Sequence, residues 1–350
     1  MNLFNNHVLY IGQKSLNDLN STYISNNYSS VSILVDENTN KFCLPILEKY
    51  IKINNVFILK SGENNKTINT CIDIWQQLSS ANIDRKALVI NLGGGVICDI
   101  GGFIASTFKR GIDFVNIPTT LLSMCDAAVG GKVAVNNNGI KNEIGLFSNP
   151  IAIYIYPDFL KTLPKRHKLS GFAEIIKHAL IGDKKLFNKI VTNSNVSEIN
   201  DELISHSIKI KKRIVKLDPL EKNIRKALNF GHSVGHALET FNNKNEDGEP
   251  ISHGEAIAVG IITESYISFL KKHISESELN QITKFILLHY KKIKIYKKNF
   301  PEIIKLIEHD KKNEKSVKLF TLLDGIGNFR INEPVTSENI ISSLDFYNNL

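Results

Sequence analysis

The chain has 350 residues, of which 42% are hydrophobic and 22% are charged. These values are ordinary for a globular protein and exclude a fibre or a disordered chain, while the length favours two domains with sizeable cores. The net charge of +8 comes from scattered lysines without a basic–aromatic nucleic-acid signature, which leaves small anionic substrates open as partners. The densest basic stretch, Lys284–Lys298, alternates with apolar residues and favours a solvated helical face over a partner surface.

The cysteines and the amino terminus indicate a cellular compartment. Cys43, Cys71, Cys98 and Cys125 form no C-x-x-C pair, which predicts neither a zinc ribbon nor a disulfide framework. The chain begins without a charged-then-apolar signal pattern, and no apolar run approaches the ~18 residues that a membrane span requires. We therefore expect a cytoplasmic protein that binds neither membrane nor nucleic acid.

Residues 1–164 alternate between short β-branched apolar runs and polar, helical segments, which predicts a doubly wound α/β domain. The expected strands are Val31–Val35, Asn55–Leu59, Ala87–Leu92, Phe114–Ile117 and Ile151–Ile155. The expected helices are Asn40–Lys52, Thr67–Ala81 and Cys98–Phe108.

Residues 165–350 have apolar residues every three or four positions, which predicts a mostly helical second domain. Thr162–Pro164 is the expected hinge, because residues before proline avoid the helical conformation. A cleft between the two domains is the place where we expect chemistry. The expected helices are Gly171–Ile181, Glu202–Leu217, Ser233–Phe241, Gly254–Lys272 and Glu276–Tyr290.

A glycine run, Gly93–Gly95, follows a predicted strand and opens a predicted helix. Consecutive glycines let backbone amides approach a phosphate, and a helix N-terminus adds positive potential. The run is not G-x-G-x-x-G, so the usual dinucleotide fingerprint does not apply. A phosphate cradle and a plain tight turn both remain open.

Histidines and one glutamate form a candidate metal site. His232 and His236 stand at i and i+4 on one helical face, His253 opens the next helix, and Glu174 interrupts an apolar helical run. One glutamate and two histidines leave a coordination position open, as catalytic zinc requires. Surface or capping histidines are the alternative, and the pair lacks the glutamate of a metalloprotease motif.

Cations and small polar residues gather on segments rich in glycine. Asp126–Lys132 and Lys141–Asn142 are expected on loops, and Arg225 and Asn229 come shortly before the histidine pair. Lysine, arginine and asparagine side chains suit a phosphate together with a carboxylate. Surface salt bridges are the alternative.

Five segments in this order resemble 3-dehydroquinate synthases, and the resemblance runs over nearly the whole chain. They are Gly93–Arg110 (GGGVICDIGGFIASTFKR), Pro118–Lys132 (PTTLLSMCDAAVGGK), Gly171–His178 (GFAEIIKH), Asn229–Glu239 (NFGHSVGHALE) and His253–Ala256 (HGEA). The resemblance implies a Rossmann-like N-terminal α/β domain, a mostly helical C-terminal domain and a homodimer. Val133 and Ala134 after Lys132, and Glu143 after Asn142, depart from the family's usual residues.

The resemblance also implies roles for individual residues. The implied metal ligands are Glu174, His232 and His253, with His236 beside them and interacting with substrate. The positions where the family contacts NAD are Asp36, Asn38, Glu63, Lys66, Gly94, Gly95, Val96, Asp99, Thr119, Thr120, Lys132 and Lys141. The positions that hold substrate are Asp126, Lys132, Asn142, Lys177, Lys211, Arg225 and Asn229. Arg110 matches an arginine that reaches the other subunit, and Lys311 and Lys312 match a late lysine motif.

The implied reaction is ring closure of 3-deoxy-D-arabino-heptulosonate 7-phosphate with loss of phosphate, a step of the shikimate pathway. Zinc or cobalt polarises a hydroxyl, and NAD is consumed and regenerated within one turnover. Cyclases that make deoxy-inosose or valiolone rings share this apparatus and remain open. An NAD-dependent polyol dehydrogenase is a further alternative, but it would need no phosphate-binding cations. A non-catalytic binding protein is another, but it would not need all three metal ligands.

Overall fold

The computed structural model describes residues 8–21, 26–138, 140–193, 199–244, 250–310 and 318–350. The chain divides into two compact units. The first comprises Met1–Pro164 and Asn200–Ile208, and the second comprises Lys165–Ile199 and Lys209–Leu350. The assignment of Asn200–Ile208 to the first unit had no signal in the sequence.

The first unit contains a six-stranded sheet in which every neighbouring pair is parallel. All five predicted strands are present. The β-branched runs of the inner strands are buried on both faces, as a parallel sheet requires, whereas the edge strand β3 has one exposed face. The edge strand β1 was missed, since four residues carry too little periodicity. In spatial order the strands are β1 (Val8–Ile11), β8 (Ala152–Ile155), β5 (Asp113–Pro118), β4 (Leu88–Gly93), β2 (Val31–Asp36) and β3 (Asn55–Leu59).

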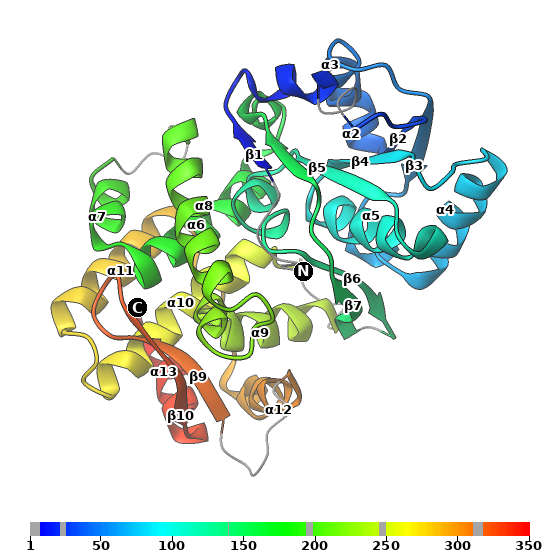
Figure 1. Ribbon diagram of the computed structural model, residues 1–350. Helices are drawn as coiled ribbons and strands as arrows, with labels where there is room; N and C mark the ends of the chain where they lie inside the picture. Colours follow the sequence, from blue (N-terminus) through cyan, green and yellow to red (C-terminus); the bar gives the residue numbers. More distant parts are fainter. Residues whose placement is uncertain (1–7, 22–25, 139, 194–198, 245–249, 311–317) are drawn as a thin grey trace. The chain divides into compact units, whose positions relative to one another are not determined.

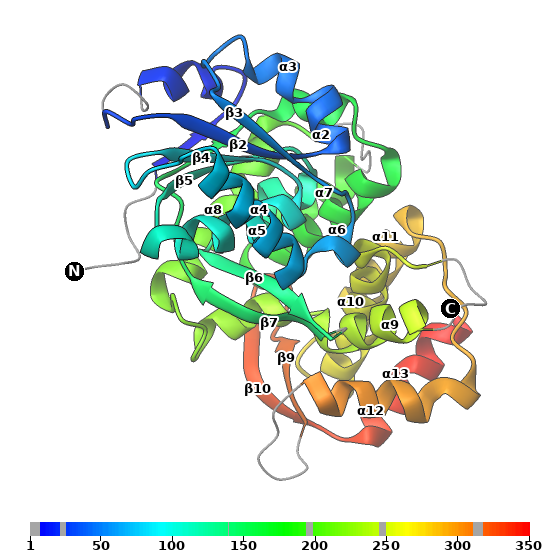
Figure 2. The same cartoon turned by 90° about the vertical axis from the view of Figure 1, so that its right-hand side faces the viewer.

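Helices cover both faces of this sheet (Figures 1 and 2). The first face carries α2 (Glu37–Phe42) and α3 (Leu44–Leu47), and the other carries α4 (Ile68–Ser80) and α5 (Gly95–Thr107). The predicted helix Asn40–Lys52 is wrong as one element. Asp36 caps α2 at its start, and the chain then breaks at Cys43 before a second short helix with proline in its first turn.

We expect the centre of this sheet to carry a large share of the stability of the first unit. Ile90 lies in β4 with 0% of its surface exposed, and Ile58 lies on the edge strand β3 with 49% exposed. Ile90→Ala should therefore lower the free energy of unfolding by about 2–5 kcal/mol through lost burial and a residual cavity. Urea unfolding measures it, and Ile58→Ala is the matched control, which should stay within about 0.5 kcal/mol of wild type. Equal losses in both variants would contradict this packing.

An antiparallel hairpin follows where loops were expected. Strands β6 (Lys132–Asn137) and β7 (Ile140–Phe147) pair with each other, so the loop prediction for Lys132, Lys141 and Asn142 is wrong. The missed signal is Asn138–Gly139, because Asn-Gly favours a two-residue hairpin turn. Asn138 has φ of 48°, and Asn137 pairs with Ile140 across this turn.

The second unit is mostly helical, and all five helices predicted there are present. Its centre is α10, which is buried nearly all round and packs against α6, α9, α11 and α13. The antiparallel strands β9 (Lys318–Leu323) and β10 (Phe329–Val335) were missed, as were α7, α12 and α13. The helices are α6 (Lys165–Gly182), α7 (Lys184–Asn193), α8 (Asp201–Leu217, which begins in the first unit), α9 (His232–Lys244), α10 (His253–Leu270), α11 (Glu276–His289), α12 (Phe300–Asp310) and α13 (Ser337–Asn349).

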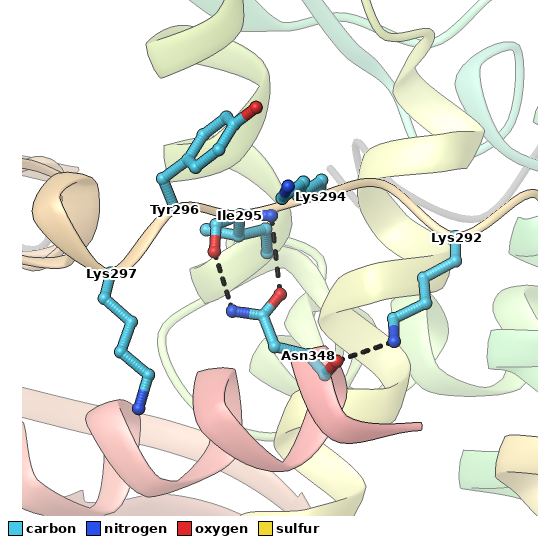
Figure 3. Close-up of a pocket in the computed structure, with 6 residues that line it drawn as sticks. All are labelled: Lys292, Lys294, Ile295, Tyr296, Lys297 and Asn348. Carbon is cyan, nitrogen blue, oxygen red and sulfur yellow. Dashed lines mark hydrogen bonds between the residues drawn. The ribbon is translucent and has the colours of Figure 1, made fainter.

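Within the basic stretch Lys284–Lys298, α11 ends at His289 and a short 3-10 helix begins only at Lys297, so its interpretation as one helical face is wrong. Beyond the helix the chain lines a cavity of about 500 Å³ (Figure 3). Lys292 Nζ donates to the Asn348 carbonyl at 2.7 Å, and Asn348 Nδ2 donates to the Ile295 carbonyl at 2.6 Å. These bonds tie the segment to the end of α13, which gives it a structural role. None of the helices in the described ranges has the length and apolar content needed to cross a membrane.

Candidate metal and cofactor sites

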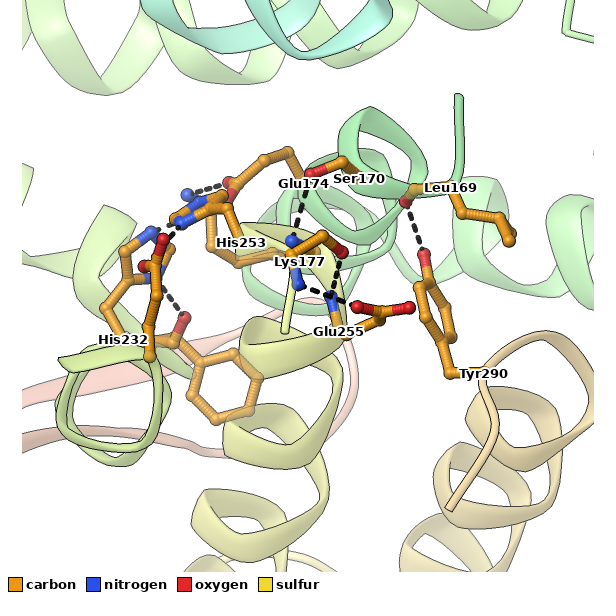
Figure 4. Close-up of polar contacts among 12 residues, drawn as sticks. Leu169, Ser170, Glu174, Lys177, His232, His253, Glu255 and Tyr290 are labelled. Atoms are coloured by element: carbon orange, nitrogen blue, oxygen red, sulfur yellow. Dashed lines mark hydrogen bonds and ion pairs between the residues drawn. The ribbon is translucent and has the colours of Figure 1, made fainter. Parts of the chain in front are cut away.

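Glu174, His232 and His253 lie together within the second unit (Figure 4). They come from α6, α9 and α10, and one donor atom from each lies within 4.8 Å of the others. Glu174 Oε1 is 3.4 Å from His232 Nε2 and 3.2 Å from His253 Nε2. The fold thus brings together three residues that are 58 and 21 positions apart along the chain.

The second ring nitrogen of each histidine has a partner of its own. His232 Nδ1 is 3.1 Å from the Phe230 carbonyl oxygen, and His253 Nδ1 is 3.3 Å from Glu239 Oε2. An acceptor at Nδ1 holds the proton there and leaves the Nε2 lone pair facing Glu174. Metal-binding histidines are commonly oriented in this way, so these three residues fit a divalent cation such as Zn²⁺ or Co²⁺.

The start of α10, and therefore His253, is fixed by three polar contacts. Ser252 and Glu255 form a reciprocal capping box, and Ser170 Oγ accepts from the Gly254 amide at 2.9 Å. Arg166 pairs with Glu255 at 2.7 Å and donates to the Pro250 carbonyl at 2.6 Å. These contacts join α6, which carries Glu174, to the first turn of α10, which carries His253.

The pKa values in the cluster follow from burial opposed by close charges. Burial would raise the pKa of Glu174, but the Lys177 ammonium and the two imidazoles outweigh it and hold the pKa well below its usual range. Burial and Lys177 lower the pKa of His232. Burial would also lower the pKa of His253, but its hydrogen bonds to Glu174 and Glu239 prevail and raise this pKa to about 9. Metal binding therefore requires His253 to lose a proton.

The raised pKa of His253 predicts how the metal-free chain responds to pH. Its pKa of about 9 in the folded chain exceeds the 6.5 of an ordinary histidine. The contribution of charged His253 to the free energy of unfolding is therefore complete below pH 6.5 and is lost as pH rises towards 9. The difference in unfolding free energy between wild type and His253→Gln should fall by about 3 kcal/mol over that window. Urea unfolding at a series of pH values in the presence of a chelator measures it.

His289 is the control with the opposite sign. Burial, and then Lys165, lowers the pKa of His289. The contribution of neutral His289 to the free energy of unfolding is therefore lost as pH falls below the pKa of histidine in the unfolded chain. The difference between wild type and His289→Gln should therefore change in the opposite direction. A pH-independent difference for His253→Gln would contradict the charge arrangement of the cluster.

His236 lies beside the cluster, and its ring centroid is 4.9 Å from that of His232. With Glu239 and His253 it forms a second group of donors within the same 4.8 Å. The two groups share His253, whose Nδ1 faces Glu239 while its Nε2 faces Glu174. Glu174, His232 and His253 are the better set of metal ligands, because Glu239 can then bind the other ring nitrogen of His253 and orient the ring.

Three of the predicted substrate-binding cations are buried in the second unit. Lys177, Lys211 and Arg225 have 1%, 5% and 2% of their surfaces exposed. Lys177 forms an ion pair with Glu174, and Arg225 donates to the Pro219 carbonyl at 2.5 Å. Asn229 donates to Glu221 at 3.3 Å, at the end of the same short helical segment as Arg225. Cations are rarely buried without an anionic or polar partner, and Lys177 and Arg225 have such partners within the chain.

In the first unit, the Lys66 ammonium contacts two other predicted residues, and Asn136 connects them to a fourth, Glu63. Lys66 has 2% of its surface exposed and binds the Asp99 carboxylate and the Asn142 amide oxygen. Asn136 accepts from the Asn142 amide at 2.9 Å and donates to Glu63 at 2.9 Å. The loop before α4, the helix α5 and the hairpin β6–β7 therefore converge at one point.

The start of α5 fits a phosphate. Gly94 occupies the cap position and has no side chain, so no side-chain bond covers the first amides of this 13-residue helix. Thr119 donates its amide to the Gly93 carbonyl at 2.9 Å, and a Cβ added at Gly94 would lie 3.1 Å from Thr120 Cγ2. The glycine run thus lies at the carboxyl end of β4, where parallel sheets bind nucleotides.

The remaining predicted residues lie on several other elements or outside the described residues. Asp36 caps α2, and Asn38 lies in its first turn. Val96 follows Gly95 in α5, and Asp126 lies in a helical turn over Ser123–Ala127. Lys132 and Lys141 lie on the hairpin, and Arg110 is exposed. Lys311 and Lys312 lie outside the described residues.

Sequence reasoning missed the residues that orient the ligands. Glu239 binds His253, and the Phe230 carbonyl binds His232. Glu239 stands seven residues after His232, about two helical turns, so helical spacing offered a signal for it. A backbone carbonyl offers no such signal.

Two family comparisons match successive parts of the chain. The 3-dehydroquinate synthase N-terminal family matches residues 56–170, and the 3-dehydroquinate synthase C-terminal family matches residues 171–313. A 3-dehydroquinate synthase from Parabacteroides distasonis is 42% identical over 326 residues, covering 91% of this chain and 92% of that protein.

Solved structures of related cyclases share the fold. A 2-epi-5-epi-valiolone synthase from Streptomyces hygroscopicus, with NAD⁺ and Zn²⁺ bound, aligns with a TM-score of 0.86 and 23% identity over 98% of this chain and 97% of that chain. A 2-deoxy-scyllo-inosose synthase in complex with carbaglucose-6-phosphate, NAD⁺ and Co²⁺ aligns with a TM-score of 0.84 and 24% identity over 96% and 95%. The predicted fold class is confirmed by this likeness.

Proposed function

This chain belongs to the 3-dehydroquinate synthase family, and on that premise we propose that it converts 3-deoxy-D-arabino-heptulosonate 7-phosphate into 3-dehydroquinate and phosphate. The observation that carries the proposal is the buried Glu174 with two oriented histidines, in a chain 42% identical to a 3-dehydroquinate synthase. The reaction class is a carbon–oxygen lyase of the shikimate pathway. The proposal includes a cytoplasmic location, which rests on the biosynthetic role of the family.

Glu174, His232 and His253 are proposed to hold a divalent cation, Zn²⁺ or Co²⁺. The support is the donor set, one carboxylate and two imidazoles whose Nδ1 atoms are engaged elsewhere. The α5 N-terminus with Lys66, Asp99 and Glu63 is proposed to hold NAD. When bound, the metal would polarise a substrate hydroxyl, and NAD would accept a hydride and return it.

The chain's own residues have separate tasks in this proposal. Lys177, Lys211 and Arg225 would bind the phosphate and carboxylate of the substrate, since buried cations hold anions more tightly than exposed ones. Asn229 and His236 would orient substrate hydroxyls beside the cluster. A substrate held in one orientation loses its phosphate and closes its ring faster than a free one, because the reacting atoms are already near each other.

The first experiment measures phosphate release from 3-deoxy-D-arabino-heptulosonate 7-phosphate with NAD and Zn²⁺, while absorbance follows NADH. We expect steady release without NADH accumulation, because the hydride returns within each turnover. His232→Ala should lower the rate at least a hundredfold through loss of a metal ligand. His167→Ala, which removes an exposed histidine of α6, is the control and should keep the wild-type rate.

The alternatives give different results in the same assay. Turnover of glucose 6-phosphate or sedoheptulose 7-phosphate in place of the carboxylated sugar would assign the chain to a sister cyclase. Stoichiometric NADH from a polyol, without phosphate release, would assign it to the dehydrogenases. Either result would overturn the proposed reaction.

The proposal also includes a homodimer in which Arg110 reaches the phosphate pocket of the other subunit. The support is local geometry: Lys109, Arg110 and Gly111 have φ of 50°, 71° and 108° in succession. Such left-handed backbone is costly for residues with side chains, and strained residues of this kind cluster at functional sites. Here it presents an exposed arginine at the end of α5.

A mixing experiment tests this contribution. Arg110→Ala and His232→Ala should each be inactive as homodimers. Refolded together in equal amounts, they should regain about one quarter of wild-type activity, because half the dimers are mixed and each mixed dimer has one intact site. No recovery, with mixed dimers demonstrated by two different affinity tags, would contradict the exchange of Arg110 between subunits.

A further inference from the structure

Helix α9, which carries His232, has no capping side chain on the residue that precedes it. Helices α2, α10, α11 and α13 each begin with a reciprocal capping box made by their own side chains. Helix α9 begins at His232, and the residue before it is Gly231, which has no side chain. The first amides of α9 therefore need acceptors from another part of the fold.

Glu264 of α10 supplies these acceptors. Its Oε2 accepts from the Gly231 amide at 2.6 Å, and its Oε1 accepts from the Val234 amide at 3.1 Å. In a capping box, the residue before the helix and its third residue exchange bonds at these same two amides. Glu264, with 0% of its surface exposed, thus performs both halves of a capping box from a neighbouring helix.

This contact depends on a close approach of the two helices. A Cβ added at Gly260 would lie 1.8 Å from the Gly231 carbonyl oxygen, so only glycine allows α9 to begin here against α10. Gly231 itself has φ of 78°, and a Cβ there would lie 2.9 Å from Ile261 Cγ1. The two glycines bring the α9 amides within reach of Glu264, one turn further along α10.

We propose that Glu264 is a positioning residue of the metal site. It joins the first turn of α9, where His232 lies between the two amides it binds, to α10, which begins with the second ligand His253. Its two bonds go to the backbone amides on either side of His232, so it acts by fixing the two helix ends relative to each other. A negative charge at a helix N-terminus also stabilises that helix through its dipole. This inference rests on the proposed metal site.

The test compares metal affinity and stability in two matched variants. Glu264→Gln keeps the shape but presents an N–H group where one amide needs an acceptor, and we expect at least a tenfold weaker affinity for Co²⁺. The visible spectrum of the Co²⁺ complex should shift as the ligand geometry relaxes. Glu278→Gln is the control, because Glu278 also accepts from two amides, Ser275 at 3.0 Å and Ile326 at 3.2 Å, away from the ligands.

The two variants separate positioning from general stability. Both should lower the unfolding midpoint, but only Glu264→Gln should change Co²⁺ affinity, measured by competition with a chelating dye. Unchanged affinity and spectrum in folded Glu264→Gln would overturn the inference, as would an equal loss in Glu278→Gln. If wild type itself bound no Co²⁺, the proposed metal site would fail separately from this inference.

Hydrogen exchange on the unmodified chain covers the case in which Glu264→Gln does not fold. In metal-free protein, the Gly231 and Val234 amides should exchange as slowly as the interior amides of α9, because Glu264 binds them before any metal does. Rapid exchange of both amides would overturn the inference without any variant.

Discussion

The buried charge of Glu174 is the constraint on which the second unit depends. A carboxylate with none of its surface exposed loses its hydration, and the cost of several kcal/mol is offset only by close cations and hydrogen bonds. Lys177 comes from the same helix, while the imidazoles of His232 and His253 come from two others. The compensation of one charge therefore fixes three helices relative to one another.

Carboxylates also hold the ends of the helices that carry the histidines. Glu255 closes the first turn of α10 from within, and Glu264 closes the first turn of α9 from a neighbouring helix. Both histidines stand at the first position of their helices, where the backbone would otherwise fray. Precise ligand placement thus depends on ordinary hydrogen bonding at helix ends, supported by glycines that allow close packing.

Local patterns were sufficient for five strands of the first unit and for five helices of the second. The β-branched strands of the first unit and the long amphipathic helices of the second were predicted within a few residues, because periodicity reports which face is buried. The hairpin β6–β7 was missed although Asn138–Gly139 favours a turn. Strands β9 and β10 were also missed, because β9 is buried at five of its six positions without alternation and Pro334 in β10 argues against a strand. The break at Cys43 follows from the cap at Asp36 and the proline after it, which periodicity does not include.

The sequence by itself determined the fold class, the family and the residue types of the site, because motifs record which side chains the chemistry needs. Only the tertiary structure decided how those side chains meet: that Glu174 is fully buried, that Glu239 orients His253, and that Lys66 joins Asp99 to Asn142. Distances and desolvation arise from packing between distant segments, and no local pattern contains them. The capping of α9 by Glu264 is likewise decided only by the tertiary structure, because the Gly231 and Val234 amides are about thirty residues away from Glu264 along the chain.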